Sequence, residues 1–83
     1  MLKTVEKLIY GNCGQKIGNH SKVALEGNIV GYKYHDTVIC KVIPIDRKII
    51  IDDGGWKTSS TTRAINSYKE YYNDFEIVDL RNK

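Results

Sequence analysis

The sequence of 83 residues is poor in several residue types that mark particular protein classes. It has one proline and two cysteines, Cys13 and Cys40, and its cysteine and histidine spacings match no common zinc site. No apolar run approaches the ~20 residues that span a bilayer, and the charges within residues 1–10 interrupt any apolar core of a secretory signal. We therefore expect no membrane partner, no metal, and two free thiols in a reducing compartment.

The excess of positive over negative charge is also small. Thirteen Lys and Arg stand against ten Asp and Glu, and the net charge of +3 lies in residues 1–41, while residues 42–83 are balanced. This balance excludes an acidic DNA mimic and permits nucleic-acid contact without requiring it. A hydrophobic share of 41% predicts a packed core. A chain this short predicts a single domain, 1–83, with little room for a large catalytic cleft.

Residues 20–53 show the pattern of an antiparallel meander. Short β-rich runs alternate with turn signals of two to four residues; the runs are 22–26, 29–34, 37–43 and 48–52. The last run holds three consecutive isoleucines, so it is apolar on both faces. We therefore expect it to be central in the sheet or covered by a helix.

A helical pattern follows the meander. The hydroxyl run at 58–62 suits a helix N-terminus, and apolar residues recur at helical spacing through 61–73, which predicts a helix with its capping turn over 58–73. Residues 75–80 read as a last strand, and residues 1–19 as a segment that ends in a loop over 11–19. Its opening stretch favours a short helix, with a strand as the alternative. Together these elements predict an α+β domain in which an antiparallel sheet of about four to five strands carries this helix on one face.

The segment Gly54-Gly55-Trp56-Lys57-Thr58, with the hydroxyl run and Ile65-Asn66 after it, resembles a family of small bacteriophage and mobile-element proteins. In that family a strand leads into Gly-Gly-Trp or Gly-Gly-Tyr, then a basic residue and Thr, a hydroxyl-rich turn, and a helix bearing Ile-Asn or Leu-Asn. The resemblance covers roughly residues 18–80. It implies a viral or mobile-element origin and action in the host cytoplasm, and it implies no activity or cofactor.

Exposed aromatic and basic residues are the candidates for a partner-binding surface. We predict that this surface is formed by Trp56, Lys57, Arg63, Tyr32 and Tyr34. The alternative for each aromatic is a place in the core, because large aromatics supply much of the buried area of small domains.

The start of the predicted helix is a candidate anion site. Hydroxyls, free backbone N–H groups and two cations are suited to hold a phosphate there, and the candidate ligands are Lys57, Thr58, Ser59, Ser60 and Arg63. The alternative is ordinary N-capping, in which the hydroxyls accept from the first-turn amides.

No catalytic, metal or cofactor motif is present, so we expect a non-enzymatic accessory protein that binds and occludes a host or host-defence (anti-CRISPR-like) protein. One alternative is a nucleic-acid-binding module that joins Lys22, Lys33 and Lys41 to the basic and aromatic residues named above. Another is capture of a small phosphorylated ligand or nucleotide at 58–63. We also expect a homodimer through an edge strand, either 75–80 or 22–26.

Overall fold

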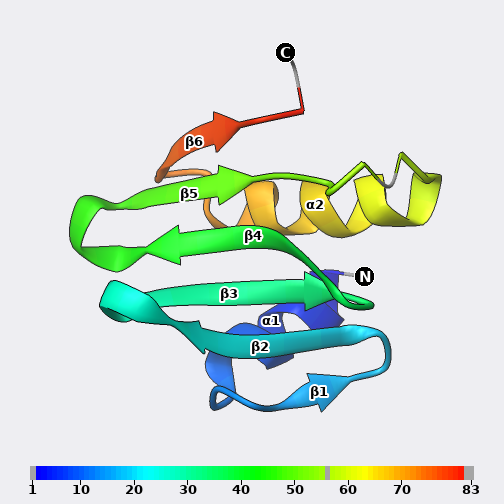
Figure 1. Cartoon of the computed structure of the whole chain (residues 1–83), viewed down its shortest axis with the longest axis horizontal. Helices are drawn as coiled ribbons and strands as arrows, with labels where there is room; N and C mark the ends of the chain where they lie inside the picture. The colour runs from blue at the N-terminus through cyan, green and yellow to red at the C-terminus, as the bar shows by residue number, and fades with distance from the viewer. Residues whose placement is uncertain (1, 56, 82–83) are drawn as a thin grey trace.

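The computed structural model describes residues 2–55 and 57–81 and shows the expected α+β architecture (Figure 1). Its elements, in chain order, are α1 (Leu2–Tyr10), β1 (Lys16–Ile17), β2 (His20–Leu25), β3 (Ile29–Tyr34), β4 (Thr37–Ile43), β5 (Lys48–Ile51), α2 (Ser59–Tyr71) and β6 (Glu76–Asp79). Short 3₁₀ turns join β2 to β3 at Glu26–Asn28 and β4 to β5 at Pro44–Asp46. The short N-terminal helix, the meander and the longer helix are thereby confirmed.

The strands form one six-stranded sheet in the order β1-β2-β3-β4-β5-β6. Two details differ from the expected sheet. β1 falls in the predicted loop, because two residues carry no periodic signal. β6 lies parallel to β5, whereas all other neighbours are antiparallel, because the chain returns through α2 before it forms the last strand.

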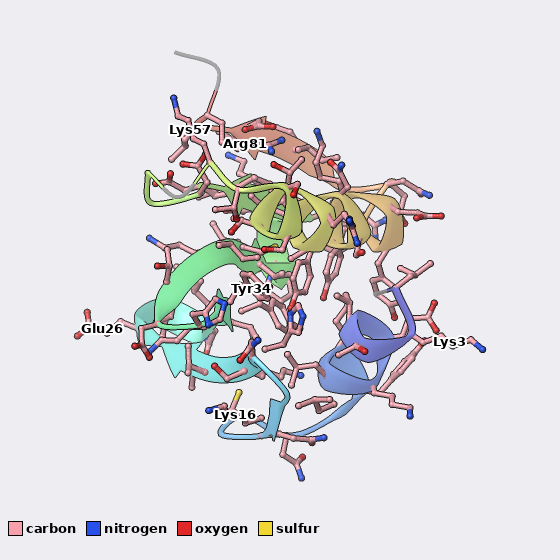
Figure 2. The ribbon with its side chains drawn as sticks, turned by 90° about the vertical axis from the view of Figure 1, so that its right-hand side faces the viewer. Lys3, Lys16, Glu26, Tyr34, Lys57 and Arg81 are labelled. Atoms are coloured by element: carbon pink, nitrogen blue, oxygen red, sulfur yellow. The ribbon has the colours of Figure 1, made fainter. Side chains whose placement is uncertain are left out.

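Both helices lie on the same face of the sheet, behind it in Figure 1 and to its right in Figure 2. The buried core lies between the two layers. It joins residues of α1 and α2 to the inward-facing residues of the central strands, and its fully buried members include Val5, Leu8, Cys40, Ile49, Ile51, Ala64, Ile65 and Tyr68. Within the described chain, neither helix is long and apolar enough to cross a bilayer.

The edges of the sheet are β1 and β6. The last strand therefore lies at an edge, as expected. β1 pairs only with the start of β2, through Lys16–Ser21 and Ile17–His20, so Val23, Ala24 and Leu25 of the run 22–26 pair with β3 alone and also lie along an edge. Dimerisation through an edge strand stays a prediction.

Candidate functional site

The hydroxyl run at the start of α2 caps the helix. Thr58 is the N-cap residue, and its Oγ1 accepts a hydrogen bond from the backbone N–H of Thr61 at 3.2 Å. The same hydroxyl donates to Thr61 Oγ1 at 2.9 Å and lies 3.3 Å from Ser60 Oγ. These hydroxyls are therefore largely committed to one another and to the helix end, as the N-capping alternative requires.

The loop between β5 and α2 is held by its two aspartates. Asp52 Oδ1 accepts from the backbone N–H of Gly54 at 3.1 Å, and Asp53 Oδ1 accepts from that of Gly55 at 2.9 Å. Such turns mimic a backbone turn with a side chain. Gly54 has a φ of 60°, and a Cβ there would lie 2.6 Å from Thr37 Cγ2. The loop is thereby fixed closely against the start of β4.

A cavity of about 410 Å³ opens between this loop, the β3–β4 turn and the first turn of α2. We call it the α2-start cavity. Its lining combines two large apolar side chains, four hydroxyls and three ionisable groups: Tyr34 and Ile39; Thr37, Thr58, Ser60 and Thr61; His35, Asp36 and Asp53. Figure 2 views the molecule from this end, with Tyr34 below α2.

The sequence suggested a positively charged site for an anion at the start of α2, whereas the charged groups that line this cavity are negative. Two carboxyl groups line it, those of Asp36 and Asp53, and no lysine or arginine is among its described lining residues. Of the five predicted anion ligands only Thr58 and Ser60 line it; Lys57, Ser59 and Arg63 are exposed residues outside the lining. The fold therefore does not gather the predicted anion ligands around one concave site.

The two strand tyrosines are buried rather than displayed. Tyr32 is 2% exposed, its ring centroid lies 4.9 Å from that of Tyr68, and its Oη lies 3.3 Å from Tyr72 Oη. Burial raises the pKa of Tyr32. Tyr34 is 9% exposed and lines the α2-start cavity. Neither ring forms part of a flat exposed surface, so the prediction that Tyr32 and Tyr34 help to form the partner-binding surface is corrected. Trp56, the third aromatic of that prediction, lies outside the described residues.

Lys22 has a structural role that the sequence did not reveal. Its Nζ donates to the backbone carbonyls of Ile9 at 2.7 Å and Gly11 at 2.9 Å, and it lies 5.8 Å from the ring centroid of Tyr32. A cation at the carbonyl end of a helix is favourable because it meets the negative end of the helix dipole. Lys22 therefore ties α1 to the sheet and is not displayed for a phosphate.

The face of the sheet opposite the helices also carries a surface that sequence reasoning missed. Alternation along the strands places on it eight half-buried apolar residues, three lysines and a glutamate: Val23, Leu25, Ile29, Val38, Ile43, Ile50, Val78 and Leu80, with Lys33, Lys41, Lys48 and Glu76. We call it the open face; it is turned towards the viewer in Figure 1. None of these eight apolar residues belongs to the buried core or packs against it.

The middle of the open face is hollowed. A depression of about 500 Å³ is walled by apolar side chains and rimmed by three charged ones: Leu25, Ile29, Val38, Ile50 and Leu80; Glu26, Lys41 and Asp52. Beside it, Gly31 has no side chain, and a Cβ there would lie 3.0 Å from both Val23 Cγ2 and Leu25 Cδ1. Glycine therefore lets these two side chains rest on the sheet. The period-two alternation of the strands was the signal that could have identified this face.

Within residues 2–55 and 57–81, no group of three or more His, Cys, Asp or Glu is placed to hold a metal ion. The thiol of Cys40 is buried and that of Cys13 is exposed. In comparisons with known proteins, no protein-family model, no curated protein and no solved structure matches the chain.

Proposed function

We propose that this protein acts by binding another protein through the open face and occluding the surface that it covers. The observation that supports this proposal is the one-sided cover of the sheet: both helices lie on one face, and apolar side chains line the other. Removing apolar area from water contributes roughly 25 cal/mol per Å². Contiguous apolar patches rimmed by polar groups are typical of interaction sites.

The dimensions of the open face suit a protein partner. The two longer axes of the molecule, which lie in the plane of Figure 1, measure 27 × 27 Å between Cα atoms. A face of that extent is of the same order as the ~800 Å² that each partner contributes to a standard interface. The shallow central hollow is suited to an inserted apolar side chain, the usual form of an interface hot spot.

The charges of the open face define the partner further. Lys33, Lys41 and Lys48 lie on three successive strands among the apolar residues, and Lys41 reaches the rim of the hollow. Glu26 and Asp52 also rim the hollow, and Glu76 lies beside Lys48. A complementary surface therefore presents an apolar anchor flanked by charges of both signs, because like charges opposed across an interface are costly. The partner class in this proposal is a host or host-defence protein, which rests on the resemblance to bacteriophage and mobile-element proteins.

The nucleic-acid alternative has less support from the geometry. Tyr32 is buried, so base stacking on it requires the core to open; Tyr34 is reached only through the α2-start cavity, and Lys22 is engaged with backbone carbonyls. Lys33 and Lys41 lie on the open face, whereas Arg63 lies on α2 on the other side of the sheet. The cations that were expected to act together are therefore divided between two sides of the molecule.

The proposal is tested by capture from host lysate with tagged protein and two aspartate variants. Ile50→Asp places a charge beside the hollow of the open face, and Asn66→Asp makes a charged substitution at an exposed position of α2. We expect the wild type and Asn66→Asp to retain the same stoichiometric protein and Ile50→Asp to lose it. Thermal melting of both variants verifies that they are folded.

Two outcomes contradict the proposal. One is the absence of any stoichiometric protein partner across conditions, and the other is equal capture by Ile50→Asp and the wild type. Light scattering on the isolated protein separates a third case. A dimer that Ile50→Asp converts to the 9.5 kDa monomer makes the open face a contact between two copies of this chain, and it also overturns the proposal.

A further inference from the structure

We infer that the α2-start cavity is a binding site for a small organic cation, an ammonium or amidinium group on an apolar or flat body. This site lies on the helix-covered side of the sheet and is independent of the open face. Its volume of about 410 Å³ falls within the ~300–1,000 Å³ of typical ligand pockets.

The sign of the ligand follows from the groups around the cavity. The carboxyl groups of Asp36 and Asp53 line it, while the positive end of α2 amounts to only about half a charge. That end is already met by the Thr58 cap, and the exposed cations Lys57 and Arg63 are not part of the lining. Arg81 lies close enough to Asp53 for their charges to interact, but it is not part of the lining either, so the lining itself has a net negative character that favours a cation over a phosphate.

Asp53 is the group best placed to hold the cation. It is only 9% exposed and yet lines the cavity, and its Oδ1 is fixed by the backbone N–H of Gly55 at 2.9 Å. Within the described residues its Oδ2 accepts no hydrogen bond. The pKa of Arg81 is raised mainly by its hydrogen bond to Asp79 and to a smaller extent by the charge of Asp53, and its side chain donates its hydrogen bonds to Asp79. A carboxylate group that lines a cavity and accepts only one hydrogen bond from the described residues can accept another from a ligand that supplies a donor.

The remaining walls suit the body of such a ligand. Tyr34 and Ile39 are buried side chains that present an aromatic ring and an aliphatic surface to the cavity. A cation within about 6 Å of an aromatic face is attracted by the ring quadrupole. Asp36 stands on the exposed β3–β4 turn, where it can meet a second donor at the rim.

Nuclear magnetic resonance titration with matched probes tests the inference. The probes are benzylammonium, benzoate, which has the same ring and the opposite charge, and inorganic phosphate. We expect benzylammonium to shift the amide signals of Thr37, Asp53 and Thr61 in a saturable manner. We expect benzoate and phosphate to leave these signals unchanged. Equal or stronger binding of either anion, or no saturable shift with benzylammonium, overturns the inference.

Two variants assign the binding to the cavity. Asp53→Asn keeps a side-chain oxygen for the turn with Gly55 and removes the charge, so we expect roughly tenfold weaker benzylammonium binding. Asp46→Asn removes an exposed carboxylate on the turn between β4 and β5, and Ile50→Asp alters only the open face; both should bind as the wild type does. An affinity unchanged by Asp53→Asn contradicts the assignment.

N-acetyl-arginine amide extends the test to the source of the cation. Saturable shifts of the same amides by this probe, at an affinity equal to or above that of benzylammonium, identify a side chain from a partner protein as the ligand. Shifts by benzylammonium alone identify a free small amine. Either result supports a cation site, because benzylammonium binds in both, and the absence of benzylammonium binding overturns it.

Discussion

The two faces of the sheet differ in what covers them, and β5 displays the difference within three consecutive isoleucines. Ile49 and Ile51 are fully buried beneath the helices, whereas Ile50 points to the open face and is half-buried. The residue type is the same, so the contrast arises from strand alternation and from the side on which α1 and α2 lie. An isoleucine on the covered face contributes mainly to folding, and one on the open face is available to a partner.

The largest expected contrast is in thiol reactivity. Cys40 lies on the covered face, where burial raises its pKa to about 12, whereas Cys13 lies exposed in the loop after α1. Three pKa units leave roughly a thousandfold less thiolate than an ordinary thiol has. Native protein treated with iodoacetamide at pH 8 should therefore be alkylated at Cys13 alone, and unfolded protein at both positions. Rapid labelling of Cys40 in the native protein would show that the core between the sheet and the helices is accessible to the reagent.

The isoleucines of β5 provide the second contrast. Ile51→Ala removes fully buried methyl groups and should lower the free energy of unfolding by about 2–5 kcal/mol. Ile50→Ala on the open face should cost about 1 kcal/mol, because its side chain is already partly in water. Urea denaturation measures both, and equal losses would remove the distinction between the two faces.

Two aspartates extend the contrast to ion pairs. Asp79 faces α2 and accepts from Arg81 at 2.9 and 2.7 Å, and Lys69 lies 3.5 Å away. The hydrogen bond from Arg81 is the main reason why the pKa of Asp79 lies well below its ordinary value of 3.8. Asp79→Asn should therefore destabilise the fold by about 1–2 kcal/mol at neutral pH.

The pH dependence of this effect has a defined sign. A carboxyl group with a lowered pKa in the folded state stabilises the fold above its ordinary pKa, and the stabilisation is lost as the pH falls below that value. The difference between wild type and Asp79→Asn should thus shrink below about pH 4. Asp74, whose bridge to Arg47 is exposed on both sides, is the matched control, and Asp74→Asn should stay within about 0.5 kcal/mol at every pH. An equal cost for both variants would contradict the contrast.

The smallest expected changes in the free energy of unfolding concern tyrosine hydroxyl groups in the core between the sheet and the helices. Tyr68 Oη is buried and has no partner among the described residues, whereas Tyr32 Oη and Tyr72 Oη face each other at 3.3 Å. Tyr68→Phe should therefore raise the free energy of unfolding by about 1 kcal/mol, and Tyr32→Phe should lower it by a similar amount. Thermal denaturation distinguishes the two, and destabilisation by Tyr68→Phe would indicate a partner for its hydroxyl.

Much of the fold could be predicted because periodicity marks it. The spacing of Ala64, Ile65 and Tyr68 predicted α2, and the alternating runs predicted the central strands. β1 could not be predicted, because two residues have no period. The parallel pairing of β6 with β5 depends on where α2 packs, which local sequence does not encode.

The candidate sites were harder to predict for a physical reason. Hydroxyls and cations next to each other along the chain indicated an anion site, but the fold leaves Lys57 and Arg63 outside the cavity and brings Asp36 and Asp53 into it. Asp36 comes from a hairpin turn that is distant in sequence from Asp53, so no local sequence motif shows that the two residues line the same cavity. Lys22 was counted as a surface cation because only the packing of α1 gives it carbonyl partners.

If a protein is captured from the lysate, its affinity for three forms of this chain tests the central claim most directly. Isothermal titration calorimetry would compare the wild type, Ile50→Asp on the open face and Asn66→Asp on α2. We expect Ile50→Asp to weaken binding by about a hundredfold, as the loss of a central anchor does, and Asn66→Asp to bind as the wild type does. An Ile50→Asp affinity equal to that of the wild type would show that the partner binds elsewhere and would contradict the role of the open face.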